Sequence, residues 1–236
     1  DADFSCVPEK GLIDPDYVTA RGAPITPGTR ITPNPSFGNP LLEDPTCADN
    51  GTDVAALESF SGPGGSTTHF SVVDKWGNMV SYTNTIESSH GAGMFAGYYP
   101  SGCTAISCFK SFGFLLNNEL TDFNFTPSLN PITGQPATND VAPGKRPRSS
   151  MVPTMIFNAA DEPIIAYGSP GGSTIINSVF NVTLNLLDHG MTIQDAIDAP
   201  RLSVTSAGST ISVDNGAPGG KFTGFSPTAL AGLTAL

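Results

Sequence analysis

The sequence holds a threonine whose surroundings suit a nucleophile. Thr67 follows the run Gly62-Pro63-Gly64-Gly65-Ser66 and begins a segment rich in Val, Thr and Phe. A threonine hydroxyl is a poor nucleophile unless a base lies beside it. Cleavage of the chain immediately before Thr67 would supply that base, because the freed α-amine has a pKa of about 8 and is partly neutral at physiological pH. Taken alone, the pattern is also typical of a simple loop-to-strand boundary.

A glycine-rich turn offers groups that stabilise negative charge. Gly168-Ser169-Pro170-Gly171-Gly172 comes directly before a predicted helix, and successive N–H groups at a helix N-terminus can hold an anion or a developing oxyanion. The turn does not match the hydrolase nucleophile elbow, because Tyr167 occupies the first required glycine position. It lacks the Gly-Lys-Ser/Thr ending of a phosphate loop. A tight strand-to-helix turn without a ligand is the alternative.

Two further motifs carry groups that would bind an amino acid. Glu119 and Asp122 follow a predicted buried strand, and two carboxylates at this spacing could bind an ammonium group. Ser149 and Ser150 come after the basic segment 145–148, and hydroxyls beside cations suit a carboxylate ligand. Taken one at a time, both motifs are also explained as a solvated strand end and a solvated basic turn.

A β-hairpin is predicted to position Thr67. Segments 67–74 and 78–86 are rich in β-branched and aromatic residues and are joined by Lys75-Trp76-Gly77. A three-residue hairpin loop requires a residue in the left-handed region at its end, and Gly77 supplies it.

The register of this hairpin brings candidate site residues to one face. Gly77 pairs Asp74 with Asn78, and counting outward places Thr67 opposite Thr85. Glu87 lies two residues beyond Thr85 and so belongs to the same face. A slip of one residue would break this relation, so the prediction depends on the turn.

The remaining elements are predicted to layer helices on strands. Residues 88–111 are rich in Gly and Ser and are expected to form an exposed loop. Helical spacing of apolar residues predicts a helix over 173–189, and Thr192 with Asp195 resembles a capping box. The other expected elements are a short helix over 14–21, a second helix that ends before Pro200, and strands at 112–116, 151–158 and 163–167.

Composition restricts the partners and the compartment. The 236 residues carry a net charge of −11 and no broad basic face, which excludes a nucleic-acid binder. No run of 18 apolar residues is present, so no membrane span is predicted. The cysteines lack metal-ligand spacing and the histidines are scattered, so no metal site is expected. Low charge favours an extracytoplasmic compartment, with Cys103–Cys108 bonded and Cys6–Cys47 paired by elimination; buried free thiols are the alternative.

Read in order, the four motifs resemble the γ-glutamyltranspeptidase family. The matching segments are Thr-Thr-His-Phe-Ser-Val-Val-Asp from Thr67, Leu-Leu-Asn-Asn-Glu-Leu-x-Asp-Phe from Leu115, Lys-Arg-Pro-x-Ser-Ser-Met-x-Pro-Thr from Lys145 and Gly-Ser-Pro-Gly-Gly-Ser from Gly168. The match runs from about Thr67 to Arg201. It implies an α+β N-terminal-nucleophile hydrolase fold, a four-layer αββα sandwich. It also implies a precursor that cuts itself before the nucleophile into a large and a small subunit.

The resemblance implies a role for each motif. Thr67 would attack the γ-carbonyl to form a γ-glutamyl ester, and Thr85 would hydrogen-bond to Thr67. No metal or cofactor is implied. The other implied roles are an oxyanion hole (Gly171, Gly172), contacts to the donor's α-amino group (Glu87, Glu119, Asp122) and contacts to its α-carboxylate (Ser149, Ser150).

The resemblance also divides the chain. Residues 1–66 resemble the tail of a large subunit, and 67–236 a catalytic small subunit that is short at its C-terminus, so the large subunit is the expected partner. The expected substrates are glutathione and other γ-glutamyl amides, with amino-acid or peptide acceptors. The alternatives are a related amide acylase or polyglutamate depolymerase, and a non-catalytic extracellular assembly protein on the same fold.

Overall fold

The computed structural model describes residues 3–4, 6–31, 38, 40, 66–127, 138–204, 211–216 and 220–235. These divide into two compact units. The first unit comprises Asp1–Glu58, Phe123–Arg148 and Phe225–Leu236, and the second comprises Ser59–Asp122 and Ser149–Gly224. Every predicted site residue falls in the second unit. The predicted division of the chain after residue 66 stays a prediction.

The first unit contributes helices α1 (Glu9–Leu12), α2 (Pro15–Gly22) and α5 (Pro227–Ala235). The helix predicted over 14–21 is confirmed as α2. Asp14 caps it, because its carboxylate accepts hydrogen bonds from the N–H groups of Asp16 and Tyr17 at 2.9 and 3.1 Å. None of the described helices has the length and hydropathy needed to cross a membrane.

The predicted hairpin is present in the second unit, as β1 (Thr68–Val73) and β2 (Met79–Asn84). Gly77 has φ +88°, and the Asp74 N–H donates to the Asn78 carbonyl at 3.0 Å. Thr68 pairs with Asn84 across the ladder. The predicted register is therefore confirmed, and it depends on the left-handed glycine in the turn.

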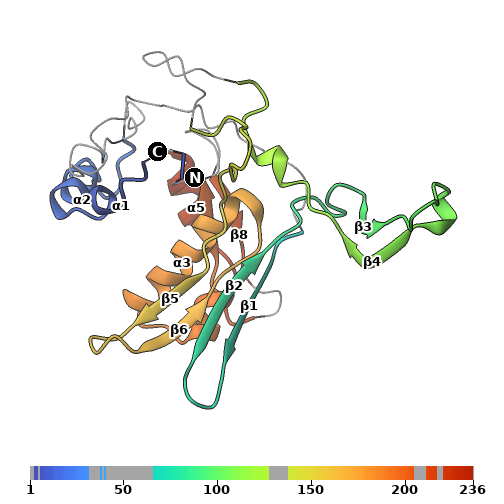
Figure 1. The fold of residues 1–236 in the computed structure, drawn as a ribbon. Coiled ribbons are helices and arrows are strands. Elements are labelled where there is room, and N and C mark those ends of the chain that lie inside the picture. The colour runs from blue at the N-terminus through green and yellow to red at the C-terminus, as the bar shows by residue number, and fades with distance from the viewer. Residues whose placement is uncertain are drawn as a thin grey trace. The chain divides into compact units, whose positions relative to one another are not determined.

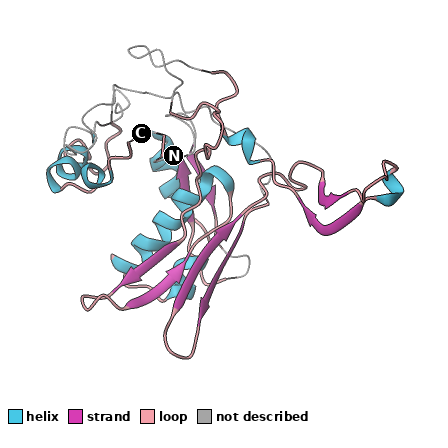
Figure 2. Cartoon of the chain, viewed as in Figure 1, coloured by secondary structure: helices cyan, strands magenta, loops and turns pink. Residues whose placement is uncertain are grey.

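A second hairpin and a helix lie beside the first (Figures 1 and 2). Strands β5 (Thr154–Phe157) and β6 (Pro163–Tyr167) pair antiparallel. The Ser81 hydroxyl of β2 donates to the Tyr167 carbonyl at 3.0 Å, which joins the two hairpins. Beyond β6, the described chain contains a 3₁₀ turn (Gly172–Thr174), α3 (Ile175–Leu187), α4 (Ile193–Asp198), β7 (Arg201–Val204) and β8 (Ile211–Asp214).

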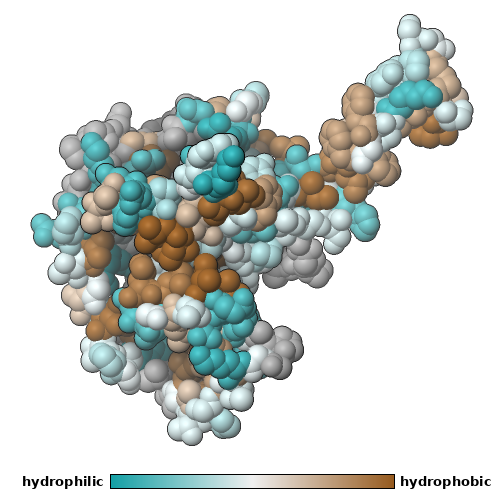
Figure 3. Space-filling view, turned by 90° about the horizontal axis from the view of Figure 1, so that it is seen from below, coloured by the Kyte–Doolittle hydropathy of each residue, from teal (hydrophilic) through white to brown (hydrophobic). Residues whose placement is uncertain are grey.

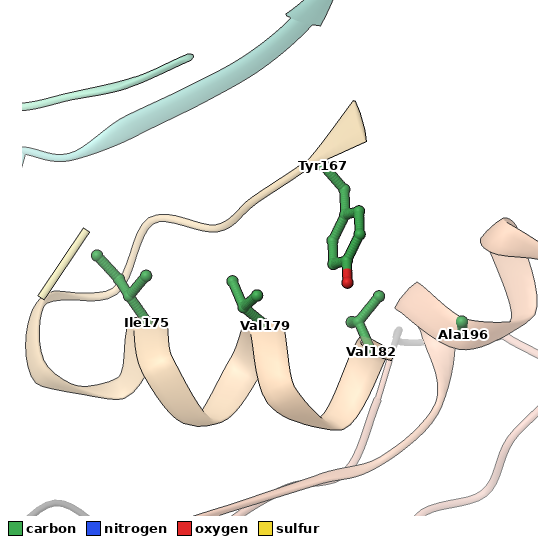
Figure 4. Close-up of a cluster of buried hydrophobic side chains, with 5 residues drawn as sticks. All are labelled: Tyr167, Ile175, Val179, Val182 and Ala196. Carbon is green, nitrogen blue, oxygen red and sulfur yellow. The ribbon is translucent and has the colours of Figure 1, made fainter. Parts of the chain in front are cut away.

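The core of the second unit forms where α3 meets β6 and α4 (Figure 4). Ile175, Val179 and Val182 lie on one face of α3, and Tyr167 stands over them with its hydroxyl toward the helix. That hydroxyl is 2.5 Å from Thr183 Oγ1. Because the residue before the glycine turn is held by both packing and hydrogen bonds, the start of the turn has a fixed position.

Asn181 is expected to contribute more to the free energy of unfolding than Asn177, which lies one turn earlier on α3. Its amide donates to the Leu202 carbonyl at 3.0 Å, and its carbonyl accepts from the Leu202 N–H at 3.4 Å, which ties α3 to β7. Asn181→Ala should lower the free energy of unfolding by about 1–3 kcal/mol, because it leaves partly buried backbone groups unpaired. The control is Asn177→Ala, which loses one long exposed bond to Val204 (3.4 Å). Equal losses in urea denaturation of the two variants would contradict the expectation.

The prediction that 88–111 form a loop is wrong in part. Strand β3 (Phe95–Tyr98) lies within it and pairs with β4 (Lys110–Leu115), across a bulge. The predicted disulfide between Cys103 and Cys108 is present in the connection between them. Glycines and serines are typical of loops, so the sequence around Phe95–Tyr98 did not predict this strand of four residues. Its pairing with β4 stabilises it. Cys47 lies outside the described residues, so the Cys6–Cys47 pairing stays a prediction.

Strand β4 is also not buried, contrary to expectation. Phe112 and Phe114 are 63% and 56% exposed, and β4 pairs only with β3 among the described strands. Apolar side chains also remain exposed on β1 and β2, where the rings of Phe70 and Tyr82 are tilted against each other with centroids 5.2 Å apart. Figure 3 shows brown apolar patches on one face of the molecule. The α+β class is confirmed, and the described strands form four two-stranded ladders.

Candidate active site

Thr67 and Thr85 meet at the open end of the first hairpin. The Thr67 hydroxyl donates to Thr85 Oγ1 at 3.1 Å, as the register predicts. Thr85 Oγ1 also accepts the N–H of Glu87 at 2.8 Å, which fixes the acceptor in place. Both threonines are half-buried. The arrangement orients one hydroxyl at the start of a strand, as a nucleophile requires.

The chain is continuous from Ser66 into Thr67, so the nitrogen of Thr67 belongs to an amide. The N–H of Ser66 donates to the carbonyl of Glu87 at 2.9 Å. This bond holds the residue before Thr67 against the end of the hairpin. The bond that would have to break to release an α-amine at Thr67 therefore directly follows a residue that is hydrogen-bonded to Glu87.

Glu87 has a left-handed backbone, with φ +70°. Such a conformation is uncommon for a glutamate and costs about 1–3 kcal/mol, which the surroundings must offset. Here the N–H bonds to Thr85 and the carbonyl accepts from Ser66. The backbone of Glu87 is therefore hydrogen-bonded to Thr85 and to the residue before Thr67. Its side chain belongs to the carboxylate cluster described next.

Three carboxylates gather beside this end of the hairpin. Oxygen atoms of Glu87, Glu119 and Asp122 all lie within 4.8 Å of one another. Burial, and then the hydrogen bond and negative charge of Asp122, raise the pKa of Glu119 to about 7. Burial and the charge of Asp122 also raise the pKa of Glu87. Glu119 Oε1 is buried and has no hydrogen-bond partner among the described residues. The cluster is therefore electrostatically suited to a cation, either an ammonium group or a metal ion.

Asn118 helps to position the carboxylate cluster, a role that the sequence pattern did not predict. Its carbonyl accepts the Ser88 N–H at 2.9 Å, and its amide donates to the Ser88 hydroxyl at 3.0 Å. These bonds hold Glu119 beside Glu87, although the two are far apart in sequence. The available signal was an Asn directly before one acidic residue and a Ser directly after the other.

The glycine turn presents free N–H groups. Gly171 and Gly172 have φ +136° and +55°, which a residue with a side chain rarely adopts. No acceptor among the described residues pairs with their N–H groups. The Gly171 carbonyl points back into the turn, where it accepts the Thr174 hydroxyl at 2.8 Å. Each of these N–H groups is therefore available to donate a hydrogen bond to a ligand.

Ser149 and Ser150 are not brought to the carboxylates by any hydrogen bond of the described residues. The Ser149 hydroxyl accepts the N–H of Met151 at 3.2 Å. Met151 and Val152 pack on the core cluster, so the residues that directly follow the serines are anchored in the second unit. Their part in binding stays a prediction.

The raised pKa of Glu119 predicts that donor capture depends on pH. In the free protein its charge appears only as pH rises through about 7. If the cluster binds an ammonium group, kcat/KM should show one rising step at about pH 7 from Glu119. Glu119→Gln should remove that step and leave the separate rise at about pH 8 that the α-amine of Thr67 produces as the base. The measurement is kcat/KM from about pH 5.5 to pH 9, with Glu162→Gln as the control on an exposed carboxylate. An unchanged step in Glu119→Gln would contradict the assignment.

The same shift has an effect on stability with a definite sign. Unfolded Glu119 ionises near its ordinary pKa, whereas in the folded state burial holds the proton until pH is about 7. The folded state therefore loses stability as pH rises between these values. Glu119→Gln should raise Tm by about 2–4 °C at about pH 8 and leave it unchanged at about pH 4.

Comparison with solved structures gives the class of the fold. The γ-glutamyltranspeptidase of Helicobacter pylori matches with a TM-score of 0.54 and 34% identity, over 71% of this chain and 80% of that one. The Pseudomonas nitroreducens γ-glutamyltranspeptidase, complexed with L-DON, matches with a TM-score of 0.53 and 33% identity, over 71% and 78%. The chain has the N-terminal-nucleophile hydrolase fold, as predicted.

Sequence comparison gives the family within that class. The γ-glutamyltranspeptidase family matches residues 1–235. The glutathione hydrolase proenzyme of Bacillus subtilis subsp. natto is 37% identical over 209 residues, which are 89% of this chain and 31% of that protein. That of Escherichia coli (strain K12) is 39% identical over 137 residues, 57% of this chain and 21% of that protein. The chain belongs to the γ-glutamyltranspeptidase family, and spans about a third of the first of these relatives.

Proposed function

We propose that the protein transfers or hydrolyses γ-glutamyl groups from glutathione and other γ-glutamyl amides through an ester on Thr67. The observation that carries this proposal is the hydrogen bond from the Thr67 hydroxyl to Thr85, at 3.1 Å. Thr85 lies two residues before Glu87, which is one of the three clustered carboxylates. A nucleophile and a site for the donor's ammonium group then lie at one end of one hairpin. The family to which the chain belongs, and its relatives named glutathione hydrolase proenzyme, support the proposal.

The first step is self-cleavage. Thr67 Oγ1 attacks the carbonyl carbon of Ser66. The hydroxyl proton passes to the nitrogen of Thr67 as the C–N bond breaks, which leaves an ester and a free α-amine. Thr85 Oγ1 lies on the proton side of the attacking hydroxyl and keeps it in position. Water then hydrolyses the ester, so that Ser66 ends in a carboxylate and Thr67 regains its hydroxyl.

The second step uses the released amine as the base. It takes the proton of the Thr67 hydroxyl as the oxygen attacks the donor's γ-carbonyl. The N–H groups of Gly171 and Gly172 hold the oxyanion. The proton passes to the leaving amine, and the γ-glutamyl ester remains on Thr67. Water or the amine of an acceptor then attacks that ester, which gives hydrolysis or transfer.

Donor recognition falls to charged and polar groups of the second unit. Glu87, Glu119 and Asp122 receive the α-ammonium group, which lowers the mutual repulsion of the three carboxylates. Ser149 and Ser150 donate to the α-carboxylate. A large subunit from the same precursor is the proposed partner and supplies a further cation for that carboxylate. The Cys103–Cys108 disulfide supports an extracytoplasmic location, where such bonds persist.

Mass spectrometry of the purified protein with a γ-glutamyl probe tests this function. N-terminal sequencing should find a chain that begins Thr-Thr-His-Phe, and a single γ-glutamyl group should map to Thr67. A protein that turns over donor without that new terminus would refute the mechanism. A γ-glutamyl group bound at any other residue would refute the assignment of the nucleophile.

A further inference from the structure

His69 lies on the same face of the hairpin as Thr67 and is held at both ring nitrogens. Side chains alternate along a strand, so positions 67 and 69 share a face, roughly 7 Å apart. His69 pairs with Thr83 in the ladder, and its Nδ1 lies 2.8 Å from Thr83 Oγ1. Its Nε2 lies 3.2 Å from Ser71 Oγ. Two hydroxyls of the hairpin therefore fix the plane and the direction of the imidazole.

The imidazole lies against Gly168, the first residue of the glycine turn. A Cβ at position 168 would lie 2.9 Å from His69 Cγ, and closer still to Nδ1 and Cε1. The backbone at 168 does not itself require glycine, since its φ lies outside the left-handed region. Glycine is therefore needed here for space, because the histidine ring occupies the place of a side chain.

The contact between His69 and Gly168 lies between the two parts of the site that the proposed reaction requires, the nucleophile and the oxyanion donors. On one side is the strand that follows Thr67, and on the other is the turn that carries Gly171 and Gly172. The neighbouring residue, Tyr167, is held by the Ser81 hydroxyl at 3.0 Å. Two adjacent residues therefore set the separation between the hairpin and the turn. Tyr167 does so through its hydrogen bond to Ser81, and Gly168 through its contact with the His69 ring.

We propose that His69 is a positioning residue, whose imidazole sets the separation between the Thr67 hydroxyl and the N–H groups of Gly171 and Gly172. The inference rests on the proposed function, since it assumes that these groups act together. Oxyanion donors work only at about 2.7–3.1 Å from the oxygen they stabilise. A displacement of about 1 Å can cost about 100-fold in rate. Burial lowers the pKa of His69, which favours the neutral ring that both hydroxyls can bond.

The test changes the size of both partners. Gly168→Ala should push the turn away from the hairpin and lower kcat about 30- to 100-fold. KM should stay within about threefold, because the carboxylate cluster that reads the donor is untouched. His69→Ser removes the ring and should lower kcat about 10-fold or more. His69→Asn keeps an amide near the position of Nδ1 and should fall between His69→Ser and the unchanged protein.

The double variant tests whether the His69 ring sets the distance between the hairpin and the glycine turn. In Gly168→Ala with His69→Ser, the new methyl group occupies space that the ring has left, so kcat should recover about 10-fold over Gly168→Ala alone. Effects that multiply independently would overturn the proposal. A parallel loss in kcat and rise in KM would also overturn it, because it indicates general damage to the fold.

Two controls match the substitutions without touching the contact. Gly22→Ala adds a methyl group where no atom lies within 4 Å. His90→Ser removes an exposed imidazole. Both should keep unchanged kcat. All variants are measured in the complete enzyme, on preparations in which the cleaved chain is shown to have a new N-terminus at Thr67.

The proposal and the proposed function fail in different ways. If the unchanged protein forms no γ-glutamyl ester at Thr67, the function is wrong, and the basis of this inference is lost with it. If the ester forms and Gly168→Ala forms it at an unchanged rate, only the role of His69 is wrong.

Discussion

Thr67→Ala is expected to abolish both the cleavage before residue 67 and the turnover of a γ-glutamyl anilide. The methyl group that remains offers neither the hydroxyl that attacks Ser66 nor the oxygen that carries the ester. Turnover should fall at least about 1,000-fold, because no other group can form the intermediate. Intact-mass analysis reports the cleavage, and release of the anilide reports the turnover.

Two controls separate the hydroxyl from its surroundings. Thr67→Ser keeps the hydroxyl that donates to Thr85 and should retain part of both reactions. Thr68→Ala alters the neighbouring exposed threonine, on the opposite face, and should leave both reactions unchanged. Cleavage in Thr67→Ala at the normal site would show that another nucleophile acts in self-processing.

Asp122→Ala is expected to lower kcat/KM for a γ-glutamyl anilide by a factor of about 30 to 4,000. Removing one partner of a buried charge-assisted contact typically costs about 2–5 kcal/mol. Self-cleavage binds no glutamate and should survive. Asp188→Ala removes an exposed carboxylate at the end of α3 and serves as the control.

A change in the donor should reproduce the effect on the unchanged protein. An N-acetylated donor has no ammonium group to pair with the carboxylates, so it should fail as badly as Asp122→Ala does with the normal donor. If an N-acetyl donor or a plain glutaryl amide reacts as fast, the pocket does not recognise the ammonium group. The acylase alternative would then replace the transferase.

The parts of the fold that sequence predicted well are those fixed by local chemistry. Gly77 supplies the left-handed turn residue, and the pairing of the whole hairpin follows from that one position. Asp14 and Pro15 begin α2 for reasons contained in a single helical turn. The relation between Thr67 and Thr85 could be predicted because it depends only on counting along two strands.

The parts that failed depend on contacts between distant residues. Nothing local distinguishes Phe95–Tyr98 from a loop until Lys110–Leu115 pairs with it. The exposure of Phe112 depends on what covers β4, which no pattern in β4 reveals. The contact of His69 with Gly168 joins positions about a hundred residues apart. Neither residue by itself indicates in the sequence that the two are in contact.

The hydrogen bond from the Ser66 N–H to the Glu87 carbonyl has a consequence for how the enzyme would switch on. Self-cleavage would turn Ser66 into a chain end that bears a carboxylate, while this bond still holds the severed end beside Glu87. That end would act as a built-in competitive inhibitor for as long as it stayed. The negative charges of Glu87, Glu119 and Asp122 would repel it, and added salt would weaken that repulsion. Full activity should therefore lag behind cleavage, with a delay that lengthens as ionic strength rises.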